Sequence, residues 1–173
     1  MKAVARFEKV SYNQFLQDYK DTFGFDEDKI KEIYDNIKMP KRATVGSAGY
    51  DFYAPIDIKL NPGETAKIPT GIRAYIEPGY VLEIYPRSGL GFKYRLQLNN
   101  TVGIIDADYY NSKNEGHIFI KITNDSNEGK SLSVPAGDGF SQGIFKEFFV
   151  TYDDDTNGIR DGGFGSTTRK ENK

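Results

Sequence analysis

From residue 43 to residue 150 the chain repeats one pattern, a short run rich in Val, Ile, Tyr and Phe followed by a turn. The runs YVLEIYP and HIFIKITN alternate between apolar and polar residues, as half-buried strands do. Gly, Pro, Asn and Asp, which suit tight turns, fill the segments between the runs. These segments are NPGE at 61–64, EPGY at 77–80, NSKNEG at 111–116, NDSNEG at 124–129 and PAGD at 135–138. Short strands at regular intervals predict an all-β sandwich or barrel.

The segment 12–37 has a different, helical pattern. Ser11 can cap a first helix with Gln14 as its capping-box partner, and Gly24 can end that helix. Asp26 can cap a second helix, whose apolar residues recur at helical spacing: Ile30, Ile33, Tyr34 and Ile37. We therefore expect a helical hairpin inserted after a first strand within residues 3–10. The hairpin either covers a sheet edge or binds a partner protein or a second subunit. The first interpretation is favoured, because the apolar face of a helix usually packs in the core of its own chain.

The composition excludes several classes of protein and site. The chain has 173 residues, which suits one domain. It has no Cys and one His, which excludes disulfides, thiolate metal sites and multi-His zinc sites. A net charge of −2 gives no electrostatic indication of nucleic-acid binding. Without a signal-peptide pattern or an apolar run long enough for a bilayer, we expect no membrane association and a cytoplasmic location.

The sequence also predicts how the chain is divided. We expect residues 1–152 to form a single β domain that includes the helical insertion. The polar stretch YDDDTNG is typical of a linker, and the glycine-rich stretch RDGGFGSTTRK that follows it is typical of a flexible arm. Residues 153–173 are therefore interpreted as a linker and a C-terminal arm.

Five short segments contain residue types that suit nucleoside triphosphate hydrolysis. Arg87, Ser88 and Gly89 offer a guanidinium, a hydroxyl and closely approachable backbone N–H groups, which together suit a phosphate. A carboxylate such as Asp106 can activate a water molecule for attack on phosphorus. A glycine-rich arm can close over the phosphates and exclude solvent. The segments are SAGYDFYA at 47–54, PRSGLGFK at 86–93, NNTVGIIDADYY at 99–110, AGDGFSQGIF at 136–145 and RDGGFGST at 160–167.

Taken together and in this order, the five segments resemble the trimeric dUTP diphosphatase (dUTPase) family over residues 38–168. The resemblance implies a jelly-roll-like β-barrel that forms a homotrimer, with active sites at the subunit interfaces. It implies hydrolysis of dUTP to dUMP and pyrophosphate, with Mg²⁺ bound to the phosphates. The C-terminal arm of one subunit would then reach over a site that the others build.

The resemblance also implies a role for individual residues. Asp106 matches the catalytic base, and Tyr109 matches the tyrosine that packs under deoxyribose and rejects a 2′-hydroxyl. Asp51 matches an aspartate that supports the metal through water. The residues matching uracil contacts are Asn100 and the backbone from Gly103 to Ile105. Those matching phosphate contacts are Arg87, Ser88, Gly89, Gln142, Arg160, Ser166 and Thr167. Phe164 and Gly165 match the C-terminal arm, as do Arg160, Ser166 and Thr167, and Phe164 would lie over the uracil.

Some features depart from the family pattern or leave alternatives open. The turn DYYNSKNEG is longer than the usual turn of the family by about five residues. Gly139 stands where the family commonly has an arginine. A dCTP deaminase of the same fold is one alternative, although the hairpin has no clear glutamate for that reaction. A regulatory module that binds a protein partner through residues 12–37 is another. We interpret His117 as structural or on the surface, and not as catalytic.

Overall fold

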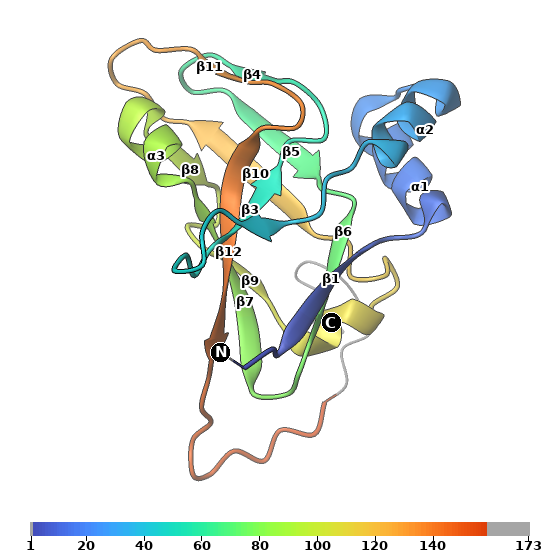
Figure 1. Cartoon of the computed structure of the whole chain (residues 1–173), viewed down its shortest axis with the longest axis vertical. Coiled ribbons are helices and arrows are strands. Elements are labelled where there is room, and N and C mark those ends of the chain that lie inside the picture. Colours follow the sequence, from blue (N-terminus) through green and yellow to red (C-terminus); the bar gives the residue numbers. More distant parts are fainter. Residues whose placement is uncertain (1, 159–173) are drawn as a thin grey trace, which may run out of the picture.

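The structure, a computed structural model, describes residues 2–158, and most of their regular structure is β (Figure 1). The strands are β1 (Ala5–Lys9), β2 (Lys41–Arg42), β3 (Tyr50–Tyr53), β4 (Ile58–Leu60), β5 (Thr65–Pro69), β6 (Ile72–Ile76), β7 (Tyr80–Pro86), β8 (Leu96–Leu98), β9 (Gly103–Ile105), β10 (Phe119–Asn124), β11 (Leu132–Val134) and β12 (Gly139–Glu147). The helices are α1 (Tyr12–Phe23), α2 (Glu27–Asp35), α3 (Ser88–Tyr94) and a 3₁₀ helix, η1 (Ala107–Asn111). The predicted all-β class with a helical insertion near the N-terminus is confirmed.

The described strands pair antiparallel in four sheets that surround a common core. The largest sheet has the order β2-β3-β12-β7-β9, and a second has the order β5-β10-β8. Two strand pairs, β1-β6 and β11-β4, complete the arrangement. The four sheets do not join into one continuously hydrogen-bonded barrel within residues 2–158. The architecture is thus jelly-roll-like, with several short sheets around one interior.

Alternation along the strands explains why these residues enclose a core. In β10 the residues Ile120 and Ile122 are buried, whereas Lys121 between them is exposed. In β7, Leu82 and Ile84 point inward in the same way. Side chains two residues apart lie on the same face of a strand, so each strand contributes one apolar row to the interior. The alternation seen in the sequence therefore determines which face of each strand packs inward.

The caps predicted for the two helices of the insertion are largely present. The hydroxyl of Ser11 accepts a hydrogen bond from the backbone N–H of Gln14, and Gly24 ends α1 with φ 66°. Asp26 caps α2 by accepting from the N–H of Lys29. The reciprocal half of the predicted capping box is wrong, because the Gln14 side chain donates to Asp18 instead of returning to Ser11. The backbone N–H of Ser11 donates instead to the carboxylate of Glu115.

The insertion has a small core of its own and packs against the β structure. Its buried side chains are Val10, Phe15, Tyr19 and Ile30. Tyr19 donates a hydrogen bond to the carbonyl of Pro69 at the end of β5, over 3.1 Å, and burial raises the pKa of its hydroxyl. Because β5 is an edge strand of its sheet, α1 covers a sheet edge, as the first interpretation of this segment expects (Figure 1).

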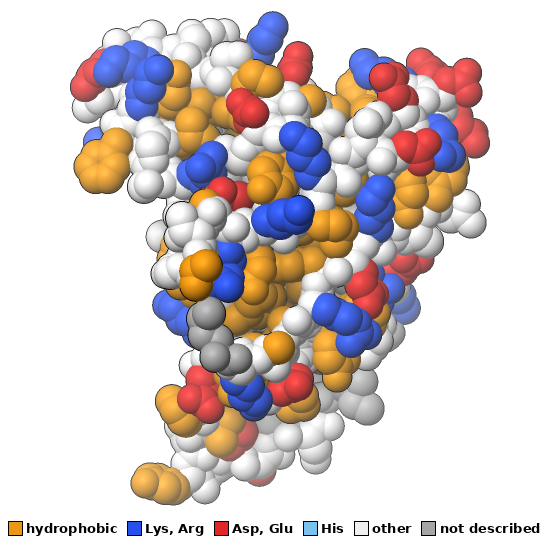
Figure 2. Space-filling model, viewed as in Figure 1, with side chains coloured by type: hydrophobic (Ala, Val, Ile, Leu, Met, Phe, Trp, Pro, Cys, Tyr) orange, Lys and Arg blue, Asp and Glu red, His pale blue; other side chains and the backbone are white. Residues whose placement is uncertain are grey.

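The face of the molecule between β1 and β12 is hollowed and apolar at its centre. Figure 2 shows hydrophobic side chains in this hollow, with Lys and Arg around it. The lining residues include Val4, Tyr50 and Phe145, with Lys2 and Arg42 as its cations. Within the described part of the chain, every helix is too short or too polar to cross a lipid bilayer.

Candidate active site

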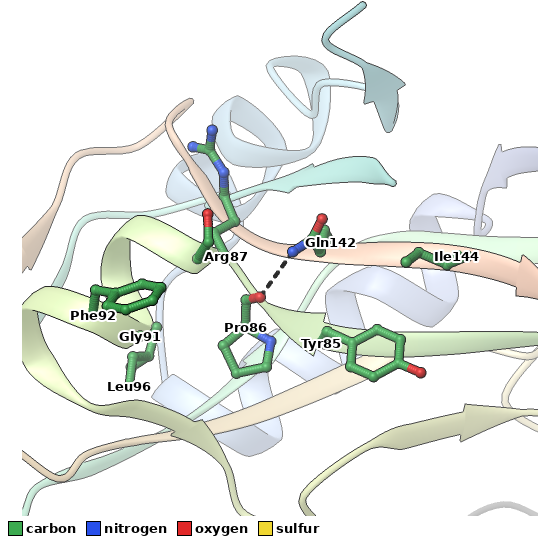
Figure 3. A pocket seen from close by; sticks show the side chains of 9 residues that line it. Tyr85, Pro86, Arg87, Gly91, Phe92, Leu96, Gln142 and Ile144 are labelled. Atoms are coloured by element: carbon green, nitrogen blue, oxygen red, sulfur yellow. Dashed lines mark hydrogen bonds between the residues drawn. The ribbon is translucent and has the colours of Figure 1, made fainter. Parts of the chain in front are cut away.

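Four of the predicted site residues lie together at the end of β7, and we refer to them as the Arg87 cluster: Asp51, Arg87, Ser88 and Gln142. Asp51 on β3 and Gln142 on β12 are paired directly opposite each other on neighbouring strands. The Nε atom of Arg87 lies 3.1 Å from Oδ1 of Asp51. The amide of Gln142 donates to the carbonyl of Pro86 over 3.1 Å, which joins β12 to the residue before Arg87 (Figure 3). The sheet thus gathers residues that are far apart in the sequence.

The predicted phosphate-binding turn is the beginning of a helix. Arg87 occupies the N-cap position of α3, with an extended backbone, and Ser88 and Gly89 form the first turn. The first N–H groups of a helix have no acceptor within it, and they favour an anion that lies close to them. The backbone therefore supports the anion-binding role expected of Ser88 and Gly89, although the local structure differs from a simple turn.

A pocket of about 600 Å³ opens beside the Arg87 cluster (Figure 3). Its floor is formed by Tyr85 on β7 and Ile144 on β12, and one wall is formed by Phe92 on α3. Phe92 is 93% exposed in the single chain. A smaller pocket shares Arg87, Ser88 and Gln142 with the first and is also lined by Asp51 and by residues of the segment before β3. Arg87 therefore lines two adjoining hollows.

Two glycines leave room for the polar side chains of the cluster. A Cβ atom at Gly139 would lie 2.8 Å from Nη1 of Arg87, which itself donates to the Gly139 carbonyl over 3.2 Å. A Cβ atom at Gly49 would lie 2.5 Å from the side-chain oxygen of Gln142. The space beside Gly139, where the family commonly has an arginine, is thus filled by the guanidinium of Arg87.

A second group of predicted residues surrounds β9. Asn100, Gly103 and Ile105 line a small pocket of about 160 Å³ between β9 and the neighbouring strands. Gly103 packs closely on Ile84 of β7, because a Cβ atom there would lie 3.1 Å from the Cβ of Ile84. The hairpin backbone that the resemblance assigns to uracil recognition is therefore held against β7.

Asp106 and Tyr109 follow β9 directly. Asp106 is partly buried and occupies the N-cap position of η1. Tyr109 is 4% exposed, and its hydroxyl donates to the carbonyl of His117 over 2.7 Å. The ring belongs to the main core of the single chain. The sugar contact expected of Tyr109 stays a prediction.

Asp106 and Arg87 lie toward opposite ends of β7. In the β7–β9 pairing Leu82 faces Ile105, so Asp106 follows at the level of Val81. Arg87 lies six residues farther along β7, which corresponds to about 20 Å at the rise of a β-strand. The Arg87 guanidinium is held by Asp51 and Gly139 at its own end of β7, so the two side chains do not converge within the single chain.

The acidic and imidazole groups of the described residues do not form a metal cage. Within residues 2–158 no three His, Cys, Asp or Glu side chains converge so that they could hold a metal ion. The carboxylate of Asp51 is paired with Arg87. Mg²⁺ typically keeps several waters and is bound through one or two carboxylates plus substrate phosphates. The donor set therefore fits an Mg²⁺ ion that is carried by a bound triphosphate.

Residues 35–168 match the family model described as dUTPase. The chain belongs to the dUTPase family. It is 44% identical over 134 residues to a deoxyuridine 5′-triphosphate nucleotidohydrolase of Lactococcus lactis. The matched region is 76% of this chain and 88% of the relative. A crystal structure of dUTPase from Streptococcus mutans shares 34% identity and a TM-score of 0.61, over 84% of this chain and 97% of that chain.

A more distant dUTPase structure shares the fold alone. It is a mutant dUTPase from phage phi11 of S. aureus, with 20% identity and a TM-score of 0.62, over 90% of this chain and 98% of that chain. That structure reveals the coordination of a structural Mg(II) ion. The predicted arm residues Arg160, Phe164, Gly165, Ser166 and Thr167 lie outside the described residues.

Sequence reasoning missed the network behind Asp106 and Tyr109. His117 is fully buried and lies 2.5 Å from Asp18 of α1, so its interpretation as structural is confirmed and a surface position is wrong. Arg73 donates to the carbonyl of Tyr110 over 2.7 Å, and its guanidinium lies 3.6 Å from the centre of the Tyr110 ring. The usable signal is a single histidine directly before an apolar strand, because histidine is intermediate between buried and exposed residue types and is hydrogen-bonded when it is buried.

Proposed function

We propose that this dUTPase-family chain hydrolyses dUTP to dUMP and pyrophosphate, and that Asp106 is the catalytic base. The observation that carries the proposal is the position of Asp106 and the Arg87 cluster at opposite ends of β7. Two half-sites arranged in this way become complete when the Asp106 end of one chain meets the Arg87 end of another. We therefore also propose a homotrimer with active sites at its interfaces, in line with the family resemblance.

The Arg87 cluster is proposed to hold the phosphates. The Arg87 guanidinium can donate to two phosphate oxygens at once. Ser88 and Gly89 add N–H groups at the start of α3, and Gln142 adds an amide on the same side of the sheet. Mg²⁺ bound to the triphosphate neutralises charge on the phosphates, and Asp51 would contact it through water. Arg160, Ser166 and Thr167 of the arm are proposed to add contacts to the β- and γ-phosphates.

Asp106 is proposed to accept a proton from the attacking water. The water oxygen forms a bond to the α-phosphorus while the bond from that phosphorus to the bridging oxygen of the β-phosphate breaks. The proton of the water passes to the Asp106 carboxylate, and the leaving group departs as pyrophosphate. A positioned carboxylate base contributes about 10²–10⁴-fold to such a reaction.

The β9 hairpin is proposed to select the base and the sugar. Backbone groups from Gly103 to Ile105, with Asn100, would pair with the edge of uracil. A cytosine presents the opposite pattern of donors and acceptors and would leave buried groups unpaired, which is costly. Tyr109 would contact the deoxyribose and reject a 2′-hydroxyl, and Phe164 of the arm would cover the uracil.

A turnover assay with dUTP, UTP, dCTP and dTTP, each with and without Mg²⁺, tests this function. We expect dUMP and pyrophosphate from dUTP in the presence of Mg²⁺, and little turnover of the other three nucleotides. Ammonia release from dCTP would instead indicate a deaminase of the same fold. Absence of turnover with all four nucleotides, in a protein that remains folded, would refute the proposed activity.

A further inference from the structure

The helical insertion is joined to the segment after Asp106 by two polar contacts. In the first, Oδ2 of Asp18 on α1 lies 2.5 Å from Nδ1 of the buried His117. In the second, the carboxylate of Glu115 accepts from the backbone N–H and from the hydroxyl of Ser11, both over 2.7 Å. Glu115 belongs to the turn that is longer here than in the family pattern, and His117 follows that turn directly.

The protonation of His117 follows from its two neighbours. The Nε2 atom accepts a hydrogen bond from the backbone N–H of Gly71 over 2.8 Å, so it carries no proton. Nδ1 therefore carries the proton and donates it to Asp18. The side-chain amide of Gln14 donates to the same Asp18 oxygen over 2.9 Å, which further fixes the position of the carboxylate. The imidazole is thus held in one tautomer between α1 and the β5–β6 turn.

Glu115 is held in an unusual backbone conformation. Its φ is 58°, in the left-handed region that non-glycine residues rarely adopt. The two hydrogen bonds from Ser11 and the bond from its own N–H to the carbonyl of Ser112, over 2.8 Å, maintain this conformation. The next residue, Gly116, has φ 70°, and a Cβ atom there would lie 2.8 Å from the carbonyl oxygen of Tyr109. The turn therefore lies directly against η1.

The same turn also holds Tyr109, which lies three positions after the predicted base, Asp106. The hydroxyl of Tyr109 donates to the carbonyl of His117 and accepts from the amide of Asn114, over 2.7 and 2.8 Å. The hydroxyl of Ser112 donates to the carbonyl of Tyr109 over 2.7 Å. His117 thus contacts α1 through its side chain and Tyr109 through its backbone. Asp106 begins the short helix that contains Tyr109.

We propose that the helical insertion is a brace that fixes η1, and that Asp18 and Glu115 are positioning residues for Asp106 and Tyr109. The inference rests on the proposed function, since it assigns these residues to the dUTP reaction. The longer turn of this chain has hydrogen bonds of its own, and the insertion adds contacts to it from outside through Ser11 and Asp18. A carboxylate base must be held within a fraction of an ångström, and small displacements cost a large part of the rate.

Asp18→Ala in the full-length chain tests the brace by its effect on the two kinetic constants. We expect kcat for dUTP to fall about 10–100-fold, with a smaller change in KM, because Asp18 makes none of the phosphate contacts proposed for the Arg87 cluster. Asp18→Asn keeps an acceptor for Nδ1 of His117 and should restore most of the rate. Gln17→Ala is the matched control, because Gln17 lies on the exposed face of the same helix and contacts only Asp21 there. It should behave as the unmodified protein.

Amide hydrogen exchange supplies a readout that does not depend on activity. Amides within residues 107–117 should exchange faster in Asp18→Ala than in Gln17→Ala, while those of β7 and β12 stay unchanged. If Asp18→Ala does not fold, Glu115→Gln serves instead, because it keeps the size of the side chain and weakens the bonds from Ser11. We expect the same direction of change in kcat and in exchange.

The outcomes separate this inference from the proposed function. A wild-type rate and wild-type exchange in both variants would overturn the brace while leaving dUTP hydrolysis intact. Lower thermal stability with unchanged kcat and unchanged exchange over 107–117 would also overturn it, since the contact would then be structural only. If the unmodified protein hydrolyses no dUTP, the proposed function fails, and the positioning inference fails with it, whatever the exchange shows.

Discussion

The guanidinium of Arg87 occupies the space that a side chain at Gly139 would fill, with Nη1 3.2 Å from the Gly139 carbonyl. The same guanidinium contacts Asp51 through Nε. The two contacts orient Arg87 at the end of β7, where it lines two adjoining pockets. The departure from the family pattern at position 139 is therefore coupled to the position of the proposed phosphate-binding arginine.

Gly139→Val should weaken substrate binding. The added side chain displaces the Arg87 guanidinium from its present position, and we expect KM for dUTP to rise about tenfold with a smaller change in kcat. Gly46→Val is a suitable control, because a Cβ atom there meets no neighbour within 4 Å. Steady-state kinetics of both variants check this expectation, and equal KM values would contradict it.

Mixed oligomers should test whether one site draws on two chains. Asp106→Asn and Arg87→Ala should each be inactive as pure oligomers. In an equal mixture of the two chains, about a quarter of the sites would combine an intact Asp106 end with an intact Arg87 end. We expect a corresponding recovery of dUTP turnover after co-refolding. A mixture that stays inactive, although the chains exchange, would mean that each chain builds its site alone.

The sequence predicts the β class, the insertion and its caps because these depend on local patterns. Ser11, Gly24 and Asp26 act on neighbouring residues, and the alternation in 117–124 selects one strand face. The Arg87–Asp51 pair and the Asp18–His117 contact join residues 36 and 99 positions apart, so no local pattern reports them. The separation of Asp106 from Arg87 likewise depends on strand register, which a single sequence does not determine.

The contact between Glu115 and Ser11 should depend on pH. Burial alone would raise the pKa of Glu115, but the hydrogen bonds from Ser11 and the charge of Arg73 together hold that pKa below its ordinary value. A carboxylate with a lowered pKa stabilises the fold above its unfolded pKa, about 4.3, and loses this contribution as the pH falls through the lower folded value.

Urea unfolding of the unmodified chain and of Glu115→Gln, at pH values between 7 and 3, measures this effect. The difference in unfolding free energy should be constant above about pH 5 and should shrink below about pH 4.3. The other carboxylates titrate in both proteins, so their contributions cancel in the difference in unfolding free energy. A difference of the same size at pH 7 and pH 3 would show that the Glu115 carboxylate does not stabilise this contact.

Asp106→Asn is the most direct test of the central claim, that this carboxylate activates the attacking water. The substitution keeps the shape of the side chain and removes its ability to accept a proton. Single-turnover hydrolysis of dUTP should fall by about 10²–10⁴-fold, while the dissociation constant for dUTP, measured by calorimetry, should stay nearly unchanged. A variant that hydrolyses dUTP at the unmodified rate would contradict the account.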